Sequence, residues 1–354
     1  MLRPFTATTI RWITARWRED VQSMTSPHGT PPNGPPEPAR PTPGQIAATL
    51  AVLGDDDGPV LQAARARLLA WVPSWGETVL GPLQAAAQAE PVLLRLRARG
   101  VLRELEVRDH LRRFAALRLG VPGRAFAPAL LEGAVLLSQM VRTFAPGTVE
   151  LAGRLRAIAL SLRKEFAGRS LPVCARRLAE RLHGEVGLRG EQGLPGDVGL
   201  GCGPGQPGAG PVAAVPGGST SLDGVPMDRV LIDRVLATRC GIPVSLSLIY
   251  LLVARWAGLS AAGVWLPGHF LVRLHGVRPV LLDPYHGGRS VTKADCARYL
   301  RAHGHDHVRE HLRDRSDREV LIHSLRCLQR AASHRAVPQT QQTLGRALAC
   351  LETS

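Results

Sequence analysis

Aromatic residues, lysine and clustered cysteine are scarce in this sequence. Aromatic residues make up 4% of the 354 positions, and Lys164 and Lys293 are the only lysines. Arginine therefore supplies almost all of the positive charge behind the formal net charge of +15. A strongly basic chain can bind acidic surfaces or nucleic acid. However, the arginines are spread along helical segments and no basic cluster is interleaved with aromatic residues, so we do not expect a nucleic-acid partner.

The six cysteines contain no CxxC pair and no spacing typical of a zinc site. We therefore expect free thiols, a cytoplasmic location and no resident metal or cofactor.

No apolar run reaches the roughly eighteen residues that span a bilayer. The longest candidate, residues 244–254, includes two serines and a tyrosine and is expected to be a core helix, so no membrane partner is expected. Residues 1–23 lack the uninterrupted apolar region and cleavage site of a targeting peptide, and Met24 is an alternative start.

Composition divides the chain into five regions. Residues 1–44 end in a proline-rich stretch that cannot bury enough surface to fold, so we expect a disordered tail. Residues 45–189 carry apolar residues at three- and four-residue spacing, which predicts an array of helices. Residues 190–224 are rich in glycine and proline without a period or a phosphate-binding fingerprint, and we expect a flexible loop insertion. Residues 225–300 and 301–354 are expected to form a compact core and a C-terminal helical pair.

The acidic run Asp55–Asp57 stands directly before Gly58 and Pro59. Acidic residues favour a helix start, and proline suits the first turn. Calcium loops need a wider ligand spacing that ends in a bidentate glutamate, so we expect helix capping here and no metal site. The acidic turn and the amphipathic helix after it resemble the opening of a HEAT-like repeat. Further helices are predicted over Val79–Ala89, Pro91–Leu105, Val107–Leu119, Ala127–Thr143, Thr148–Ala167 and Ala175–His183.

The stretch from Arg239 to Gly288 contains the densest set of chemically capable residues. An apolar helix is predicted from Pro243 to about Trp256, because proline suits a first turn and a glycine follows at position 258. Three short strands are then predicted. They cover Gly263–Leu266, His269–Leu274 and Val280–Asp283, and the last two are expected to form a hairpin.

The predicted hairpin places a histidine beside a carboxylate. Gly276 lies midway between the two strands, so symmetric pairing would set His269 opposite Asp283, with Cβ atoms roughly 4.5–5.5 Å apart. Such a carboxylate can orient an imidazole, which is the base-and-orienter half of a nucleophilic triad. Cys240 lies just before a predicted helix N-terminus, where a thiolate is favoured. The alternative is a purely structural pair, with Cys240 as a small buried apolar residue.

At these residues the sequence resembles the transglutaminase-like superfamily, specifically its bacterial SirB-type branch. The resemblance implies a papain-like α+β fold, mostly helical here, with a short antiparallel sheet. It also implies that His269 and Asp283 occupy the histidine and aspartate positions of the catalytic triad. The matching residues are Arg239, Gly241, Ile242, Pro243, Val244, Ser245, Leu246, Tyr250, Ala254, Gly258, Leu259, Gly263, Val264, Pro267, Gly268, His269, Phe270, Asp283, Pro284, Gly287 and Gly288.

One departure from the family pattern decides the expected function. The resemblance places the nucleophile about fifteen residues before Gly258, which is Pro243 in this chain, and proline has no nucleophile. We therefore expect a non-catalytic binding or scaffold module with a protein or peptide partner. Two alternatives remain open. One is a cysteine-dependent hydrolase or acyltransferase using Cys240, His269 and Asp283, and the other is an adaptor acting through its helical surfaces.

The C-terminal region is predicted to be helical. Helices are expected over Thr292–Ala302, Asp317–Ala332 and Gln341–Leu351, and the last two resemble a single tetratricopeptide-like pair. A lone repeat of this kind must dock on a core to be stable. The alternating histidines His303, His305 and His307 would make a metal site only if the segment were extended and supported by further partners, so we expect an exposed turn instead.

Overall fold

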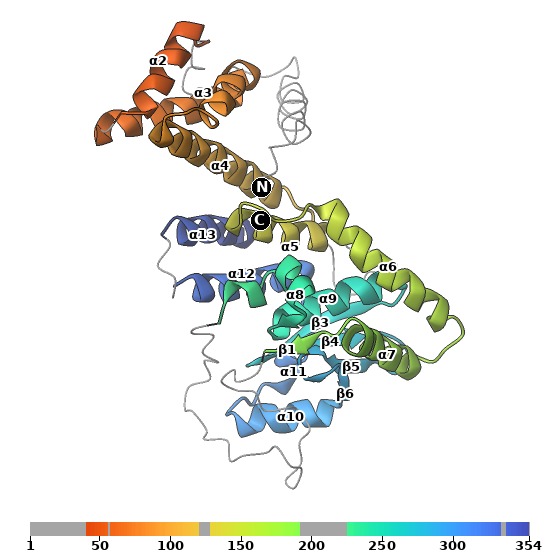
Figure 1. Cartoon of the computed structure of the whole chain (residues 1–354). Helices are drawn as coiled ribbons and strands as arrows, with labels where there is room; N and C mark the ends of the chain where they lie inside the picture. Colours follow the sequence, from red (N-terminus) through yellow and green to blue (C-terminus); the bar gives the residue numbers. More distant parts are fainter. Residues whose placement is uncertain (1–39, 56, 120–127, 192–224, 334–337, 354) are drawn as a thin grey trace, which may run out of the picture. The chain divides into compact units, whose positions relative to one another are not determined.

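The computed structural model describes residues 40–55, 57–119, 128–191, 225–333 and 338–353 (Figure 1). The chain is mostly helical with a small four-stranded antiparallel sheet in its C-terminal part, as predicted. It separates into two compact units, Met1–Asp109 and His110–Ser354. Among the described helices, none combines the length and the apolar character needed to cross a bilayer.

The first unit contains α2 (Pro43–Leu53), α3 (Gly58–Ala86) and most of α4 (Val92–Ala115). Thr42 caps α2 and exchanges hydrogen bonds with Gln45, so the helix begins inside the predicted 1–44 tail. The Asp57 carboxylate accepts from the backbone N–H of Val60 at 3.3 Å, which confirms the predicted capping role. Apolar side chains from all three helices form one core, which includes Leu53, Leu68, Leu83, Ala98 and Val101.

Two helix boundaries in the first unit differ from the sequence prediction. Residues 79–86, predicted to start a separate helix, belong to α3, which bends at Trp75 where the backbone leaves helical geometry (φ −127°, ψ 32°). Pro73 lies two residues before the bend, and its missing N–H removes one helical hydrogen bond from this part of α3. The predicted break before Val107 is absent, and α4 is continuous there. Ion pairs from Arg103 to Glu106 and from Arg108 to Glu104 support the helix across that point.

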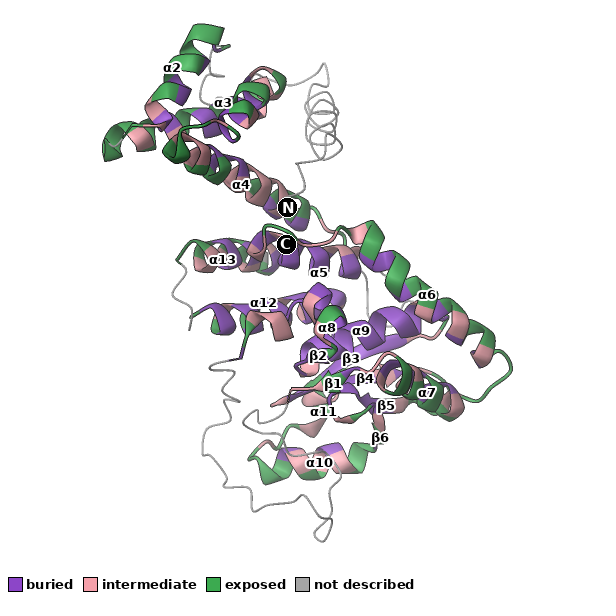
Figure 2. Ribbon diagram, in the orientation of Figure 1, coloured by how far each residue is buried: buried purple, intermediate pink, exposed green. Residues whose placement is uncertain are grey.

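The second unit is built around α9 (Pro243–Trp256), whose bounds match the prediction. Every residue from Val244 to Arg255 is buried, and Figure 2 shows this helix among the most buried elements. The sheet runs β3 (Ala261–Leu266), β4 (His269–Leu274), β5 (Val280–Asp283) and β6 (Arg289–Val291) in sequence order. Helix α9 packs on β3 and β4, while Cys296 and Leu300 of α10 (Lys293–Ala302) pack on the opposite face.

Further helices surround this core. They are α5 (Pro128–Val141), α6 (Thr148–Phe166), α7 (Leu171–Ala179), α8 (Ile232–Thr238), α11 (Val308–His311), α12 (Asp317–Ser333) and α13 (Pro338–Thr353). Short helical turns occur at η1 (Glu180–Glu185), η2 (Met227–Arg229) and η3 (Pro284–His286). Two strands of two residues, β1 (Arg189–Gly190) and β2 (Cys240–Gly241), pair in parallel. Except for Gly190 and Glu191, the predicted insertion 190–224 lies outside the described residues.

The β4–β5 hairpin has a different register from the predicted one. Leu274 pairs with Val280, so the hairpin is centred on Val277 and not on Gly276. The predicted register would have placed Pro279 inside the ladder, where its missing N–H cannot donate a hydrogen bond. Consequently His269 is not directly opposite Asp283.

A buried ion pair connects α9 to α12. One guanidinium nitrogen of Arg255 lies 2.8 Å from an Asp317 carboxylate oxygen, and both side chains are 2% exposed. The Nε–H of Arg255 also donates to the carbonyl of Ala261 at 3.0 Å. Burial raises the pKa of Asp317, and the charge of Arg255 opposes that rise. The predicted C-terminal helical pair is therefore attached to the core through a charge interaction that water does not reach.

We predict that Arg255→Met lowers the free energy of unfolding by about 3–5 kcal/mol, because it leaves the Asp317 carboxylate buried without its partner. The double variant with Asp317→Leu should recover most of that loss, since two apolar residues can replace a buried pair. Urea unfolding measures both. As a control, Arg326→Met breaks an exposed pair with Glu352 and should cost less than about 1 kcal/mol. Equal losses of unfolding free energy in Arg255→Met and Arg326→Met would contradict the prediction.

Candidate functional site

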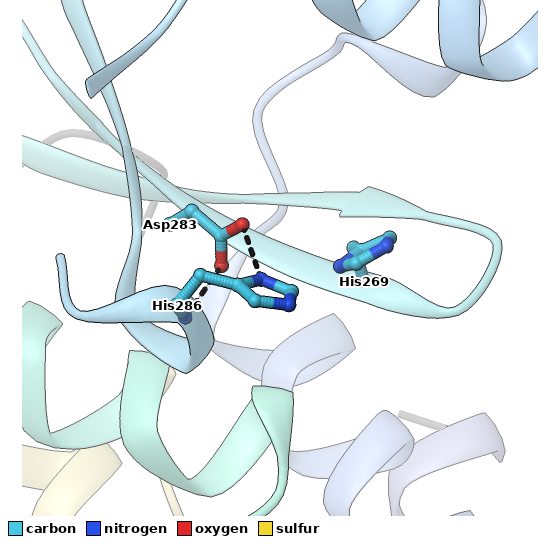
Figure 3. Close-up of side chains that lie close together, drawn as sticks. All are labelled: His269, Asp283 and His286. Carbon is cyan, nitrogen blue, oxygen red and sulfur yellow. Dashed lines mark hydrogen bonds and ion pairs between the residues drawn. The ribbon is translucent and has the colours of Figure 1, made fainter. Parts of the chain in front are cut away.

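Asp283 ends β5 and caps the turn that follows it. Its Oδ1 accepts from the backbone N–H of His286 at 3.3 Å, and its Oδ2 lies 2.8 Å from Nδ1 of the same residue (Figure 3). Pro284 occupies the first position of η3, where a missing N–H is tolerated. The local sequence Asp-Pro-Tyr-His therefore folds into a turn that returns the histidine ring to the carboxylate.

His269 lies on the same face of the sheet as Asp283. Side chains alternate along a strand, so His269 shares its face with Leu271 on β4, and Asp283 shares its face with Leu281 on β5. Both leucines belong to the cluster beneath α10. The His269 ring is 5.6 Å from the His286 ring and 5.0 Å from the Tyr299 ring, measured between centroids.

His269, Asp283 and His286 form one compact group. Each offers a ligand atom, and these three atoms lie within 4.8 Å of one another. His269 and Asp283 are buried, whereas the His286 side chain is 20% exposed. The hairpin tip that presents His269 is held in place because the Tyr299 hydroxyl donates to the carbonyl of Pro267 at 2.8 Å.

The charge state of Asp283 follows from its partners. Burial raises the pKa of this carboxyl, but the hydrogen bond from His286 and the nearby charges of His286, His269 and Arg289 outweigh burial and lower the pKa overall. The Arg289 guanidinium lies 3.9 Å from the Asp283 carboxylate. Asp283 is therefore an anion at neutral pH, and it can orient an imidazole or bind a cation.

Cys240 is engaged by a different carboxylate. In the described part of the chain its thiol donates to Oε2 of Glu191 at 2.9 Å, and it has no hydrogen bond to His269. Glu191 also forms an ion pair with Arg229 at 2.5 Å. Burial raises the pKa of the Cys240 thiol, and the hydrogen bond and charge of Glu191 raise it further. The structure thus brings His269 and Asp283 together, while Cys240 is paired elsewhere.

The first turn of α9 holds a proline and two occupied hydroxyls. Pro243 is the first helical residue. The Ser245 hydroxyl donates to the carbonyl of Arg229 at 2.7 Å, and the Ser247 hydroxyl donates to the carbonyl of Phe270 at 2.5 Å. Both serines are buried. Their protons are therefore directed at backbone oxygens.

The sequence interpretation missed His286 and Arg289. The spacing Asp-Pro-x-His was a usable signal for His286, because an aspartate cap followed by proline turns the chain back within three residues. Arg289 is the first residue of β6. This strand is too short to show a periodic pattern in the sequence, so Arg289 could not be placed beside Asp283. The alternating histidines His303, His305 and His307 form no group of metal-ligand distance within the described residues, and the segment around them is a turn followed by irregular chain.

Gly288 adjoins this group at a position that excludes a side chain. Its φ is +71°, and an added Cβ would overlap the Tyr250 hydroxyl and approach the Cβ of Ala179 to 2.7 Å. Its N–H donates to the carbonyl of Asp283 at 2.9 Å. The neighbouring Gly287 has a similar φ of +76° but no heavy atom within 4 Å of an added Cβ.

We predict that Gly288→Ala destabilises the protein by more than about 2 kcal/mol, through left-handed strain plus overpacking. Gly287→Ala should lower stability by only about 1–2 kcal/mol, because it adds the strain alone. Urea unfolding of the two variants separates the cost of the backbone strain from the cost of the overpacking. Equal losses would mean that contact with Tyr250 and Ala179 does not limit this position.

Comparison with known proteins covers the same part of the chain. Residues 225–326 match the sequence profile of the transglutaminase-like superfamily. Two curated relatives, both called "UPF0162 protein" and both from Xylella fastidiosa (strain 9a5c and strain Temecula1 / ATCC 700964), are 40% identical over 73 residues, 20% of this chain. The match spans only 26% of each relative's length. No solved structure matches. Within residues 225–326 the chain therefore carries a transglutaminase-like superfamily domain, with the UPF0162 proteins as distant homologues.

Proposed function

We propose that the transglutaminase-like domain is a non-catalytic binding module of the SirB type, working in the cytoplasm on a protein or peptide partner. The observation that carries this proposal is Pro243 at the first position of α9, where the family resemblance places the nucleophile. A proline side chain can neither attack a carbonyl nor be activated by His269. The remaining question is whether another residue supplies the nucleophile.

Cys240 is poorly placed for that role. A catalytic thiol needs a neighbouring base or a lowered pKa, whereas Glu191 and burial raise the pKa of Cys240. The sulfur also lies in β2, outside the first turn of α9 where the helix dipole acts. Ser245 and Ser247 donate their protons to carbonyl groups and not to an imidazole. These contacts support binding over acyl transfer.

The net charge of the chain suits recognition of an acidic group. The chain carries a formal charge of +15. We therefore propose an acidic protein or peptide segment as the partner. A second candidate, an adaptor acting through helical surfaces, is favoured by Val92, Leu93 and Leu96 at the start of α4, which are 46–57% exposed.

Alkylation of Cys240 by iodoacetamide tests the proposal directly. We predict a rate that rises with a midpoint above the ordinary thiol pKa of about 8.5, because burial and Glu191 disfavour the thiolate. His269→Ala should leave this midpoint unchanged. Site-resolved mass spectrometry distinguishes Cys240 from the other cysteines. A midpoint below about 7 that rises in His269→Ala would show a Cys–His ion pair and would make the cysteine-dependent hydrolase or acyltransferase the better assignment.

Glu191→Gln is the matched variant for this measurement. It removes the negative charge beside the sulfur and keeps the shape of the side chain, so the pKa of Cys240 should fall and alkylation at pH 8 should become faster. The charge of Arg229, which already favours the thiolate, would then act without its carboxylate partner. An unchanged rate would mean that Glu191 does not control this thiol.

Duplex DNA provides a separate test of the partner class. We predict weak binding that is lost by about 0.2 M salt, because diffuse arginines make few phosphate contacts and such contacts weaken steeply with salt. A fluorescence anisotropy titration at two salt concentrations measures this. Tight, salt-resistant binding to a defined sequence would replace the protein partner with a nucleic acid.

A further inference from the structure

We propose that His269, Asp283 and His286 bind one divalent transition-metal ion of the zinc or iron(II) class. The group combines two imidazoles with one carboxylate, and its three ligand atoms lie within 4.8 Å of one another. Two histidines with one carboxylate is a ligand set that binds zinc or iron(II) and leaves coordination positions open. The proposal shares its side chains with the proposed binding function but does not depend on the state of Cys240.

The separations are close to those of a coordination sphere. Metal–ligand bonds of about 2.0–2.2 Å place neighbouring ligand atoms about 3–3.5 Å apart. Nδ1 of His286 and Oδ2 of Asp283 are already 2.8 Å apart. An ion coordinated by these two atoms replaces the proton in their hydrogen bond, and that proton leaves to solvent. The ligand atom of His269 lies within 4.8 Å of the other two, so it needs to approach them by up to roughly 1.3–1.8 Å to reach that spacing.

The backbone holds the three ligands on short, fixed segments. His269 is the first residue of β4 and follows Gly268, whose positive φ of 78° forms the hairpin turn. Asp283 ends β5, and His286 ends the η3 turn that Asp283 caps. Ligands that are fixed by strand ends and a capped turn lose little conformational freedom on binding an ion. Entry is available because the His286 side chain is 20% exposed.

One neighbouring residue lowers the affinity for the ion. Arg289 opposes binding, since its guanidinium lies 3.9 Å from the Asp283 carboxylate and competes with the ion for it.

The test uses the full chain, freed of metal with a chelator and then titrated with Co²⁺, whose visible ligand-field absorption reports coordination by protein atoms. We expect one equivalent to bind and Zn²⁺ to displace it. His286→Gln should weaken Co²⁺ binding at least about tenfold, by analogy with the loss of residues that support metal ligands. Circular dichroism checks that the His286→Gln variant is folded.

Two further variants make the result specific. His305→Gln changes a histidine outside the group and should leave binding unchanged, whereas Arg289→Gln removes the competing cation and should tighten binding several-fold. Absence of the cobalt spectrum in the native chain, an unaffected His286→Gln variant, or loss of binding in His305→Gln would each overturn the proposal. Cys240 alkylation is read independently, so failure here would not decide the proposed function.

Discussion

The second unit depends on a carboxylate that water does not reach. Asp283 is 0% exposed, and a buried charge is tolerated only when it is paired or hydrogen-bonded. Its compensation comes from the backbone and ring of His286, from the charge of Arg289, and from His269 across the sheet. These groups belong to β4, η3 and β6, so folding must assemble all three segments around one anion. Gly288 completes the arrangement because its N–H binds the Asp283 carbonyl.

Much of this core could be predicted from sequence because its signals are local. Helix α9 has its predicted bounds, because a proline at the first turn, a continuous apolar run and a following glycine mark both of its ends in the sequence. Strands β4 and β5 also have their predicted bounds. The hairpin register could not be predicted from the midpoint of the two strands, since the missing N–H of Pro279 decides it. The two-residue strands β1 and β2 leave no periodic signal, and ion pairs within α4 support the helix across the predicted break.

The site was predictable in part for the same reason. His269 and Asp283 are recognisable from the motifs around them, and the structure adds His286 from a turn that can be derived from its own four residues. The partner of Cys240 is a different case. Glu191 lies 49 positions away in the chain, beyond an insertion whose composition gives no indication of where its ends meet. Only the parallel pairing of β1 with β2 brings the two residues together.

The carboxylates of Glu191 and Asp283 differ in their chemistry, although Tyr285 contacts Glu191 and the histidine that is paired with Asp283. Tyr285 donates its hydroxyl to the Glu191 carbonyl, and its ring packs edge-on against His286. The Glu191 carboxylate disfavours the thiolate form of Cys240. The Asp283 carboxylate lies within metal-ligand distance of the His269 and His286 imidazoles. A buried ionic cluster is weak support for stability, because apolar replacements are often as stable or more so. The proposed binding of an ion would give the two imidazoles around Asp283 a role beyond compensating its buried charge.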